Sequence, residues 1–303
     1  MLVVALPGGG TLAAKLAQAL KCDWSELALH RFPDGETLVR LDVPVAGRCV
    51  VLAGSLNQPD EKTLPLLFAA DAARDQGAAQ VGLVAPYLAY MRQDRQFNAG
   101  EAVTSRSYAR LLSSALDFLV TVDPHLHRWH SLDEIYPIRT KLVSSAAPIA
   151  RWLRRSVKLP LIVGPDKESE PWVVAVADLL DAPWTVLKKT RRGDRDVTVQ
   201  GLASGLKALA LKDIADRTPV LLDDIVSTGE TMMAAVAALK RAGLAAPVCV
   251  GVHALFGADT LWRLGQAGAS RVVTCDSITH ASNAIALAPV LAKAVLAVAK
   301  ERR

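Results

Sequence analysis

The sequence predicts an α/β protein with two similar domains, each a mainly parallel sheet flanked by helices. Short apolar runs rich in β-branched residues alternate with longer segments rich in Ala and Leu, as strands and helices do in this fold class. The runs show no alternation of polar and apolar residues, so the strands are expected to be buried on both faces. At 303 residues, the chain is about twice the length of a common domain.

Eight runs are predicted strands because each is short, near-continuous and apolar. In chain order they are Leu2–Ala5, Val50–Ala53, Val81–Ala85, Phe118–Val122, Leu161–Val163, Pro219–Leu222, Val248–Val252 and Val272–Thr274. The segments between them have the length and composition of helices. The clearest are Thr11–Leu20, Leu64–Gln76, Ser105–Ala115, Pro171–Leu180 and Thr231–Ala242.

The two halves of the chain repeat one pattern of strand, loop, helix, glycine and strand. The first copy begins at Cys49 and the second at Pro219. Such an echo suggests two copies of one α/β domain. The expected boundary lies near residue 145, which gives domains 1–145 and 146–303. The last helix either stays in the second domain or packs back on the first.

Composition narrows the class of partner. The formal net charge is +5 and the pI about 9.1, which favours an anionic partner. No block of five basic residues and no known nucleic-acid-binding motif appears, so no nucleic-acid partner is expected. The four cysteines include no CxxC pair, which argues against a disulfide framework and a structural zinc site.

No membrane partner is expected either. The longest stretch without a charged residue, Ala242–Ala258, is too short and too interrupted by Pro and Gly to span a bilayer. The N-terminus has no basic residue before its apolar run, so it does not resemble a secretory signal. A cytoplasmic protein is therefore predicted.

The most specific local pattern is a Ser/Thr/Gly loop that follows a buried strand and opens a helix. A helix N-terminus offers N–H groups and a partial positive charge to an anion. The hydroxyls add donors, and the glycine lets the backbone approach a ligand closely. The predicted phosphate-binding residues are Ser227, Thr228, Gly229, Glu230 and Thr231.

Two adjacent carboxylates, Asp223 and Asp224, precede this loop at the end of the strand, where ligands of open α/β sheets bind. They can accept hydrogen bonds from the vicinal hydroxyls of a sugar. Together, the acidic pair and the loop predict a ribose 5-phosphate site. The alternative is that these residues only cap the helix.

The string Val220–Thr231 resembles the phosphoribosyl-binding loop of type I phosphoribosyltransferases, which implies that fold for both domains. That family includes the ribose-phosphate pyrophosphokinases, also called phosphoribosyl pyrophosphate synthetases. Further segments resemble those synthetases and occur in the family's order, so the resemblance covers nearly the whole chain. They are Arg31–Thr37, Pro86–Arg95, Leu119–His127, Val163–Glu168, Leu187–Asp194, Ser277–Asn283 and Leu287–Ala294.

The first of these segments suits a base-binding loop. Phe32 offers a stacking face and Gly35 allows a tight turn, while Asp34 and Glu36 can accept hydrogen bonds from an exocyclic amine. The resemblance implies that the loop binds ATP, often in the site of a neighbouring subunit. It therefore implies a homo-oligomer with the ATP site at or near a subunit interface. Without the resemblance, a Pro-Asp-Gly turn between strands would explain these residues.

The second segment has the family's order Pro-Tyr-x-x-Tyr-x-Arg-Gln-Asp-Arg after a predicted strand. Arg92 can form a fork of hydrogen bonds to phosphate oxygens. Gln93 and Asp94 can hold Arg92 in place or contact the nucleotide. The resemblance implies ATP binding for all three.

The next two segments supply candidate metal ligands. The resemblance implies that His125 and Asp166 help to hold a magnesium–ATP complex. A hard oxygen ligand suits Mg²⁺, which keeps several waters and bridges phosphates. His127 and His130 suggest a zinc cluster with His125, but no Cys lies nearby and the neighbouring carboxylates complete no zinc pattern.

The basic segment Leu187–Asp194 resembles the family's flexible catalytic loop. The resemblance implies that Lys189 and Arg191 are catalytic, and Lys188 and Arg192 stay open as the alternative register. Without the resemblance, a solvated charge run would explain this segment.

The resemblance implies a ribose-phosphate diphosphokinase, which transfers pyrophosphate from Mg-ATP to the C1 hydroxyl of ribose 5-phosphate. The products would be phosphoribosyl pyrophosphate and AMP. Two alternatives are a phosphoribosyltransferase that consumes phosphoribosyl pyrophosphate and a non-catalytic regulatory subunit of the same fold. The segment Lys167–Pro171 departs from the family's Gly-rich turn and adds two carboxylates near the expected magnesium.

Overall fold

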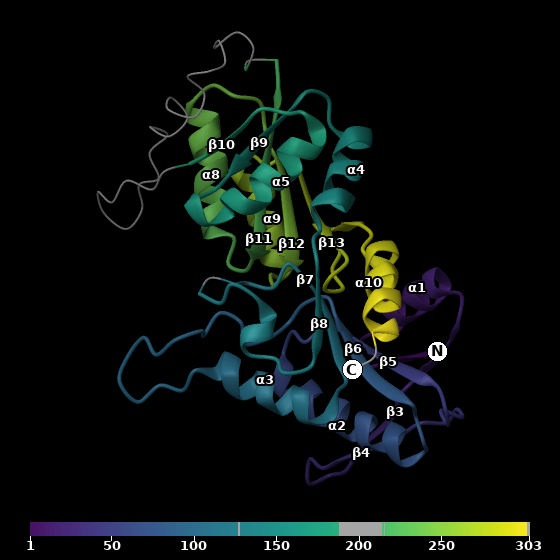
Figure 1. Ribbon diagram of the computed structural model, residues 1–303. Coiled ribbons are helices and arrows are strands. Elements are labelled where there is room, and N and C mark those ends of the chain that lie inside the picture. The colour runs from purple at the N-terminus through teal and green to yellow at the C-terminus, as the bar shows by residue number, and fades with distance from the viewer. Residues whose placement is uncertain (127, 188–213, 215, 302–303) are drawn as a thin grey trace. The chain divides into compact units, whose positions relative to one another are not determined.

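The computed structural model describes residues 1–126, 128–187, 214 and 216–301. It separates into two compact units (Figure 1). Unit 1 comprises Met1–Ser144 together with Leu287–Arg303, and unit 2 comprises Ser145–Ala286. The chain thus leaves unit 1 once and returns to it with its last helix.

Unit 1 contains a six-stranded sheet of order β2-β1-β5-β6-β7-β8, in which all neighbouring strands are parallel. Its strands are β1 (Leu2–Ala5), β2 (Asp23–Glu26), β5 (Cys49–Ala53), β6 (Gln80–Ala85), β7 (Phe118–Val122) and β8 (Arg139–Val143). A separate antiparallel hairpin consists of β3 (Ala28–Arg31) and β4 (Thr37–Arg40). Its described helices are α1 (Gly10–Leu20), α2 (Pro59–Asp75), α3 (Thr104–Ala115), the 3-10 helix η1 (Leu132–Glu134) and α10 (Ala288–Lys300).

Unit 2 contains a second six-stranded parallel sheet, of order β10-β9-β11-β12-β13-β14. Its strands are β9 (Pro160–Gly164), β10 (Trp184–Val186), β11 (Thr218–Val226), β12 (Val248–Ala254), β13 (Arg271–Cys275) and β14 (Asn283–Ile285). Its described helices are α4 (Ala146–Ser156), the 3-10 helix η2 (Lys167–Ser169), α5 (Glu170–Leu180), α8 (Glu230–Arg241) and α9 (Ala258–Ala267).

The two sheets have the same strand order. When the hairpin is left aside and the strands of each unit are numbered from its first, both sheets follow the order 2-1-3-4-5-6. This repetition confirms the predicted fold class of two similar, mainly parallel α/β domains. The order reverses beside the first strand, which creates a topological switch point between β1 and β5 in unit 1 and between β9 and β11 in unit 2.

The last helix completes the core of unit 1. α10 packs against α1, β7 and β8, and Figure 1 shows α10 beside α1. Leu291, Val295 and Val298 on α10 are fully buried. The guanidinium of Arg139 on β8 donates a hydrogen bond from Nη1 to the Val298 carbonyl over 2.8 Å, which helps to satisfy the end of the helix.

Close packing between neighbouring strands depends on one glycine of β6. Gly82 lies beside Phe118 of β7 in the sheet. A Cβ built on Gly82 would lie 2.0 Å from the Phe118 ring, so the ring occupies the space that a side chain at position 82 would need.

None of the described helices combines the length and apolar character needed to cross a membrane.

Candidate active site

In unit 2, polar residues gather at the switch point between β9 and β11, which are parallel neighbours. Ligands of open α/β sheets bind beyond the carboxyl ends of the strands at such a point. Asp166 follows β9, and Asp223 and Asp224 lie in the last part of β11. The loop Ser227–Thr231 comes next and includes the first turn of α8. The structure therefore brings together the residues predicted to bind the sugar and its phosphate.

The acidic pair is closely packed. Asp224 is 6% exposed, and its N–H donates to Oδ1 of Asp223 over 3.0 Å. Burial raises the pKa of Asp223 to about 8, and the charges of Asp224 and Asp166 contribute to the rise. The three carboxylates thus share one electrostatic environment. Hydroxyl donors or a cation bound there would relieve their repulsion.

The loop after β11 enters α8 through a glycine in the left-handed region. Gly229 is the N-cap residue and has a φ of 74°, in the left-handed region that favours glycine. A Cβ at this position would lie 2.6 Å from Cγ2 of Thr260. Among the described residues no side chain caps α8, and Oγ1 of Thr228 is 3.5 Å from the N atom of Glu230, which is long for a hydrogen bond. Side-chain capping therefore contributes little at this helix start, and a helix N-terminus of this kind can bind an anion through its N–H groups.

Asp166 is held at the start of η2. Its Oδ1 accepts a hydrogen bond from the N–H of Glu168 over 3.0 Å. Its carbonyl accepts one from the hydroxyl of Ser169 over 2.6 Å. Gly164 makes this turn possible, because a Cβ there would lie 2.3 Å from the same hydroxyl oxygen. The carboxylate of Asp166 is thereby kept near Asp223.

In unit 1, strained backbone marks the turns beyond β6 and β7, which are parallel neighbours. Tyr90 has a φ of 62° and Asp123 a φ of 34°. Such conformations cost on the order of 1–3 kcal/mol each, persist only where surrounding contacts fix them, and cluster at functional sites. Tyr90 precedes Arg92 by two residues, and Asp123 precedes His125 by two. Both strained turns therefore carry residues predicted to serve the nucleotide.

The side chains next to Arg92 are engaged by other parts of unit 1. Oε1 of Gln93 accepts a hydrogen bond from the Thr104 hydroxyl over 3.1 Å. Asp94 is buried, and its Oδ1 accepts from Nη1 of Arg128 over 2.7 Å. Its other oxygen, Oδ2, has no hydrogen-bond partner among the described residues. Because Arg92 itself is exposed, it is the residue of the three that the turn presents to solvent.

The predicted metal ligand His125 is half-buried after the turn at Asp123. The N–H of Asp123 donates to the carbonyl of Val143 at the end of β8 over 3.1 Å, which fixes the start of this segment. Within the described parts of the chain, no group of three or more His, Cys, Asp or Glu side chains is placed to hold a metal ion. A cation here would need further oxygen ligands, and Mg²⁺ takes these from phosphates and water.

The hairpin of β3 and β4 carries the first predicted ATP segment. The N–H of Phe32 donates to the Glu36 carbonyl over 2.9 Å, and Gly35 has a φ of 93°. Oδ1 of Asp34 accepts from the N–H of Glu36 over 3.1 Å, as in a tight turn. This geometry is the one expected of a Pro-Asp-Gly turn. Phe32 is 40% exposed, and its ring packs in a T-shaped arrangement with the ring of His30 at 4.7 Å between centroids.

The switch point of unit 1 differs from that of unit 2 in the residues that line it. At the places where β11 carries its acidic pair, unit 1 has Ala53 and Gly54. A Cβ on Gly9 would lie 2.4 Å from the Ala53 carbonyl oxygen, and one on Gly54 would lie 2.8 Å from Cβ of Leu6. Backbone and a buried leucine therefore pack closely against these two glycines, and no carboxylate pair is present there. The sugar-phosphate role is accordingly expected of unit 2.

Three residues near these turns carry contacts that sequence analysis missed. They are Asp60, Thr104 and Arg128, which bond to Tyr90, Gln93 and Asp94. The only sequence signal was the second tyrosine of the Pro-Tyr-x-x-Tyr motif, whose partner lies 30 residues earlier in the chain. The predicted catalytic residues Lys189 and Arg191, their alternatives Lys188 and Arg192, and His127 lie outside the described residues.

Comparison with known proteins identifies the family. The N-terminal domain of ribose phosphate pyrophosphokinase matches residues 1–115, and the phosphoribosyl transferase domain matches residues 132–289. A ribose-phosphate pyrophosphokinase of Methanopyrus kandleri is 32% identical over 297 residues, which cover 97% of this chain and 98% of the relative. The chain belongs to the ribose-phosphate pyrophosphokinase family. The resemblance found in the motifs is thereby confirmed.

Other relatives of the ribose-phosphate pyrophosphokinase family agree in length and fold. The ribose-phosphate pyrophosphokinase of Methanobrevibacter smithii is 32% identical over 288 residues, 93% of this chain and 95% of the relative. The crystal structure of phosphoribosylpyrophosphate synthetase from Mycobacterium smegmatis superposes with a TM-score of 0.82 at 22% identity. That match covers 99% of this chain and 98% of the other, so the family fold extends over both units.

Proposed function

We propose that this chain is a ribose-phosphate diphosphokinase that transfers the pyrophosphoryl group of ATP to the C1 hydroxyl of ribose 5-phosphate. The products are phosphoribosyl pyrophosphate and AMP. The observation that carries the proposal is the switch point of unit 2, where an acidic pair is followed by a Ser/Thr/Gly loop at the start of α8, in a chain that matches the family over nearly its full length.

Unit 2 binds the acceptor sugar in this proposal. The N–H groups at the start of α8 and the hydroxyls of Ser227, Thr228 and Thr231 bind the 5-phosphate. Asp223 and Asp224 accept hydrogen bonds from the ribose hydroxyls. The sugar hydroxyls thereby replace water around two carboxylates whose burial is otherwise unfavourable.

Unit 1 binds the nucleotide. Arg92, which the turn presents to solvent, forms charge-assisted hydrogen bonds to the phosphates. Phe32 and the carboxylates of Asp34 and Glu36 bind the base. Because the family places this hairpin in a neighbouring subunit's site, we further propose a homo-oligomer with the ATP site at or near a subunit interface.

Magnesium fits the donor set. Asp166 can supply a hard oxygen ligand, and the pKa of Asp223 is raised by burial first and by the charges of Asp224 and Asp166 second, so a nearby cation would offset unfavourable negative charge. We propose that Asp166 would be a ligand of Mg²⁺ bound to the phosphates of ATP, and the family resemblance implies a role in binding magnesium–ATP for His125. The cation would neutralise phosphate charge during transfer.

The transfer is catalysed by positioning and electrostatics. The C1 oxygen of the sugar attacks the β-phosphorus, the bond between the α–β bridging oxygen and the β-phosphorus breaks, and AMP leaves. We propose that Lys189 and Arg191 neutralise the charge that develops on the transferring group. No covalent enzyme intermediate is required.

Two other functions are less well supported. A phosphoribosyltransferase would need the unit 2 site but not the strained turn with Arg92. A regulatory subunit would not need the full set of Asp166, the Lys/Arg segment and the acidic pair with its Ser/Thr/Gly loop.

We also propose that the protein is cytoplasmic, which suits the proposed substrates.

The test is product analysis. Purified protein incubated with ATP, Mg²⁺ and ribose 5-phosphate should release AMP and phosphoribosyl pyrophosphate in equal amounts. Omission of ribose 5-phosphate should stop AMP release. Release of ADP, or no product at all, would contradict the proposal.

A further inference from the structure

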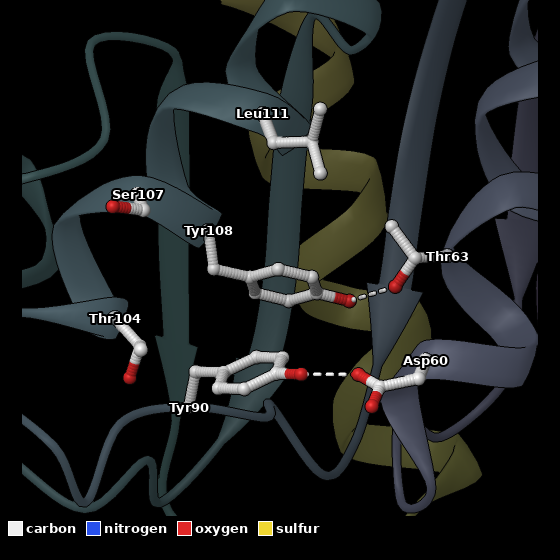
Figure 2. Close-up of a pocket in the computed structure, with 7 residues that line it drawn as sticks. All are labelled: Asp60, Thr63, Tyr90, Thr104, Ser107, Tyr108 and Leu111. Atoms are coloured by element: carbon white, nitrogen blue, oxygen red, sulfur yellow. Dashed lines mark hydrogen bonds between the residues drawn. The ribbon is translucent and has the colours of Figure 1, made fainter. Parts of the chain in front are cut away.

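A cavity of about 420 Å³ in unit 1 lies beside the turn that carries Arg92. Its walls come from α2, α3 and the turn itself, and Figure 2 shows the two tyrosine rings side by side within it. The lining residues are Asp60, Thr63, Tyr90, Thr104, Ser107, Tyr108 and Leu111. None of these residues has been assigned a role in the reaction.

Two hydrogen bonds cross this cavity. The Tyr90 hydroxyl donates to Oδ1 of Asp60, in the first turn of α2 (Figure 2). The hydroxyls of Tyr108 and Thr63 lie 3.0 Å apart, and Thr63 also donates to the Pro59 carbonyl over 2.6 Å. The Tyr90 and Tyr108 rings pack at 4.8 Å between centroids. Tyr90 and Tyr108 therefore share a ring contact, but their hydroxyls form hydrogen bonds with different residues.

Only Tyr90 is joined directly to the turn. Its φ of 62° is unfavourable for a side chain of this size and needs external contacts to persist. The bond to Asp60 supplies one such contact, and because it also raises the pKa of Tyr90, the phenol keeps its proton at neutral pH. Asp60 lies at a helix N-terminus, where a negative charge is favoured.

The far side of the turn is held as well. Gln93 accepts hydrogen bonds from the Thr104 hydroxyl over 3.1 Å and, at its carbonyl, from the N–H of Ser105 over 3.3 Å. Arg92 is therefore flanked by two anchors, one on α2 and one at the start of α3. Neither anchor uses the Arg92 side chain itself.

From this arrangement we propose that Tyr90 and Asp60 are positioning residues that hold Arg92 ready for the nucleotide phosphates. The proposal rests on the function proposed above, because it assigns the ATP phosphates to Arg92. Loss of the Tyr90–Asp60 bond lets the strained turn relax, so that Arg92 must be reordered each time ATP binds.

The experiment compares two hydroxyl deletions from one cavity. Tyr90→Phe should raise the KM for ATP about tenfold and leave the KM for ribose 5-phosphate within about twofold. Tyr108→Phe is the matched control, since it also loses one hydroxyl contact while Thr63 keeps its bond to Pro59; it should leave both values near the wild type. Asp60→Ala should match Tyr90→Phe, and Asp60→Asn, which retains an acceptor oxygen, should restore part of the affinity.

Two further readouts separate positioning from a general structural effect. The double variant Tyr90→Phe/Asp60→Ala should have the same KM for ATP as either single variant, because both substitutions remove the same hydrogen bond. Hydrogen exchange of the amides in residues 88–95 should be faster in Tyr90→Phe than in Tyr108→Phe. Three results would overturn the proposal. They are additive increases in the KM for ATP in the double variant, equal exchange rates in Tyr90→Phe and Tyr108→Phe, and equal increases in KM for ATP and ribose 5-phosphate in Tyr90→Phe. A wild-type protein that releases no AMP would instead refute the proposed function. The exchange comparison would still test whether the Tyr90–Asp60 hydrogen bond holds the turn.

Discussion

At the scale of single residues, Asp223 makes the stability of the unliganded protein depend on pH. Burial and the neighbouring carboxylates raise its pKa to about 8 in the folded chain, whereas an unfolded Asp titrates near 3.9. Between about pH 4 and pH 8 the folded state binds more protons than the unfolded state. The free energy of unfolding should therefore fall as pH rises through this window.

Asp223→Asn should remove this dependence. We expect the variant to be more stable than the wild type by roughly 1–3 kcal/mol at pH 8.5 and close to it at pH 4, as measured by urea unfolding. Asp178→Asn, on the exposed surface of unit 2, is a control that should change little at either pH. An equal increase in the free energy of unfolding at pH 4 and pH 8.5 would show that the pH dependence does not come from Asp223. The Asp223 variant should also lose affinity for ribose 5-phosphate.

The catalytic segment gives a second residue-scale prediction. Lys189→Ala should lower kcat by a factor on the order of 10²–10³ with little change in either KM, because its contacts are proposed to form mainly in the transition state. Lys188→Ala tests the register, and it should have a far smaller effect. Steady-state kinetics for both substrates decide the matter. A larger effect at Lys188 would shift the register by one residue, and parallel changes in KM and kcat would remove the catalytic role.

At the scale of elements, burial explains which strands could be predicted. The eight predicted strands are β1, β5, β6, β7, β9, β11, β12 and β13, which are the eight interior strands of the two sheets. The missed strands are the four sheet edges, β2, β8, β10 and β14, and the β3–β4 hairpin. β2 reads Asp-Trp-Ser-Glu and β8 begins Arg-Thr-Lys, because an edge or exposed strand needs no continuous apolar run.

Helices were predicted where an apolar segment stood alone between strands. α1, α2, α3, α5 and α8 correspond to the five predicted segments, and the start of α2 falls five residues before its predicted start. α4 and α9 were not among the predicted segments, and α4 begins at the expected domain boundary, with Ser145 as its N-cap and Pro148 in its first turn. Pro is acceptable in the first turn of a helix, where its missing N–H has no partner to lose.

The contact between β6 and β7 carries the element-scale prediction. Gly82→Ala should destabilise the protein by about 1–3 kcal/mol, because the new Cβ would lie 2.0 Å from the Phe118 ring. Gly265→Ala on α9 is the control: nothing lies within 4 Å of its added Cβ, and it should be neutral or stabilising. Thermal unfolding measures both. In the Gly82→Ala background, Phe118→Leu should recover part of the loss; no recovery would show that the strain lies elsewhere.

At the scale of the whole molecule, the two units share one strand order but carry their candidate site residues after different strands. In unit 2 the residues of the proposed sugar-phosphate site, Asp223–Thr231, form one contiguous stretch at the switch point, so the sequence alone was enough to propose that site. Unit 1 has Ala53 and Gly54 at its switch point, and its candidate polar residues follow β6 and β7 instead. Their anchors, such as Asp60 and Arg128, come from distant parts of the chain, so sequence spacing could not reveal them.

The return of α10 to unit 1 leads to the last prediction. Leu291 is fully buried in the packing of α10, whereas Leu296 on the same helix is 42% exposed. Leu291→Ala should therefore cost about 2–5 kcal/mol, and Leu296→Ala about 0.5 kcal/mol or less. Because α10 packs on α1, β7 and β8, hydrogen exchange in Leu291→Ala should quicken in those elements and not in β9, β11 or β12. Faster exchange in the unit 2 strands would show that the helix stabilises unit 2 instead.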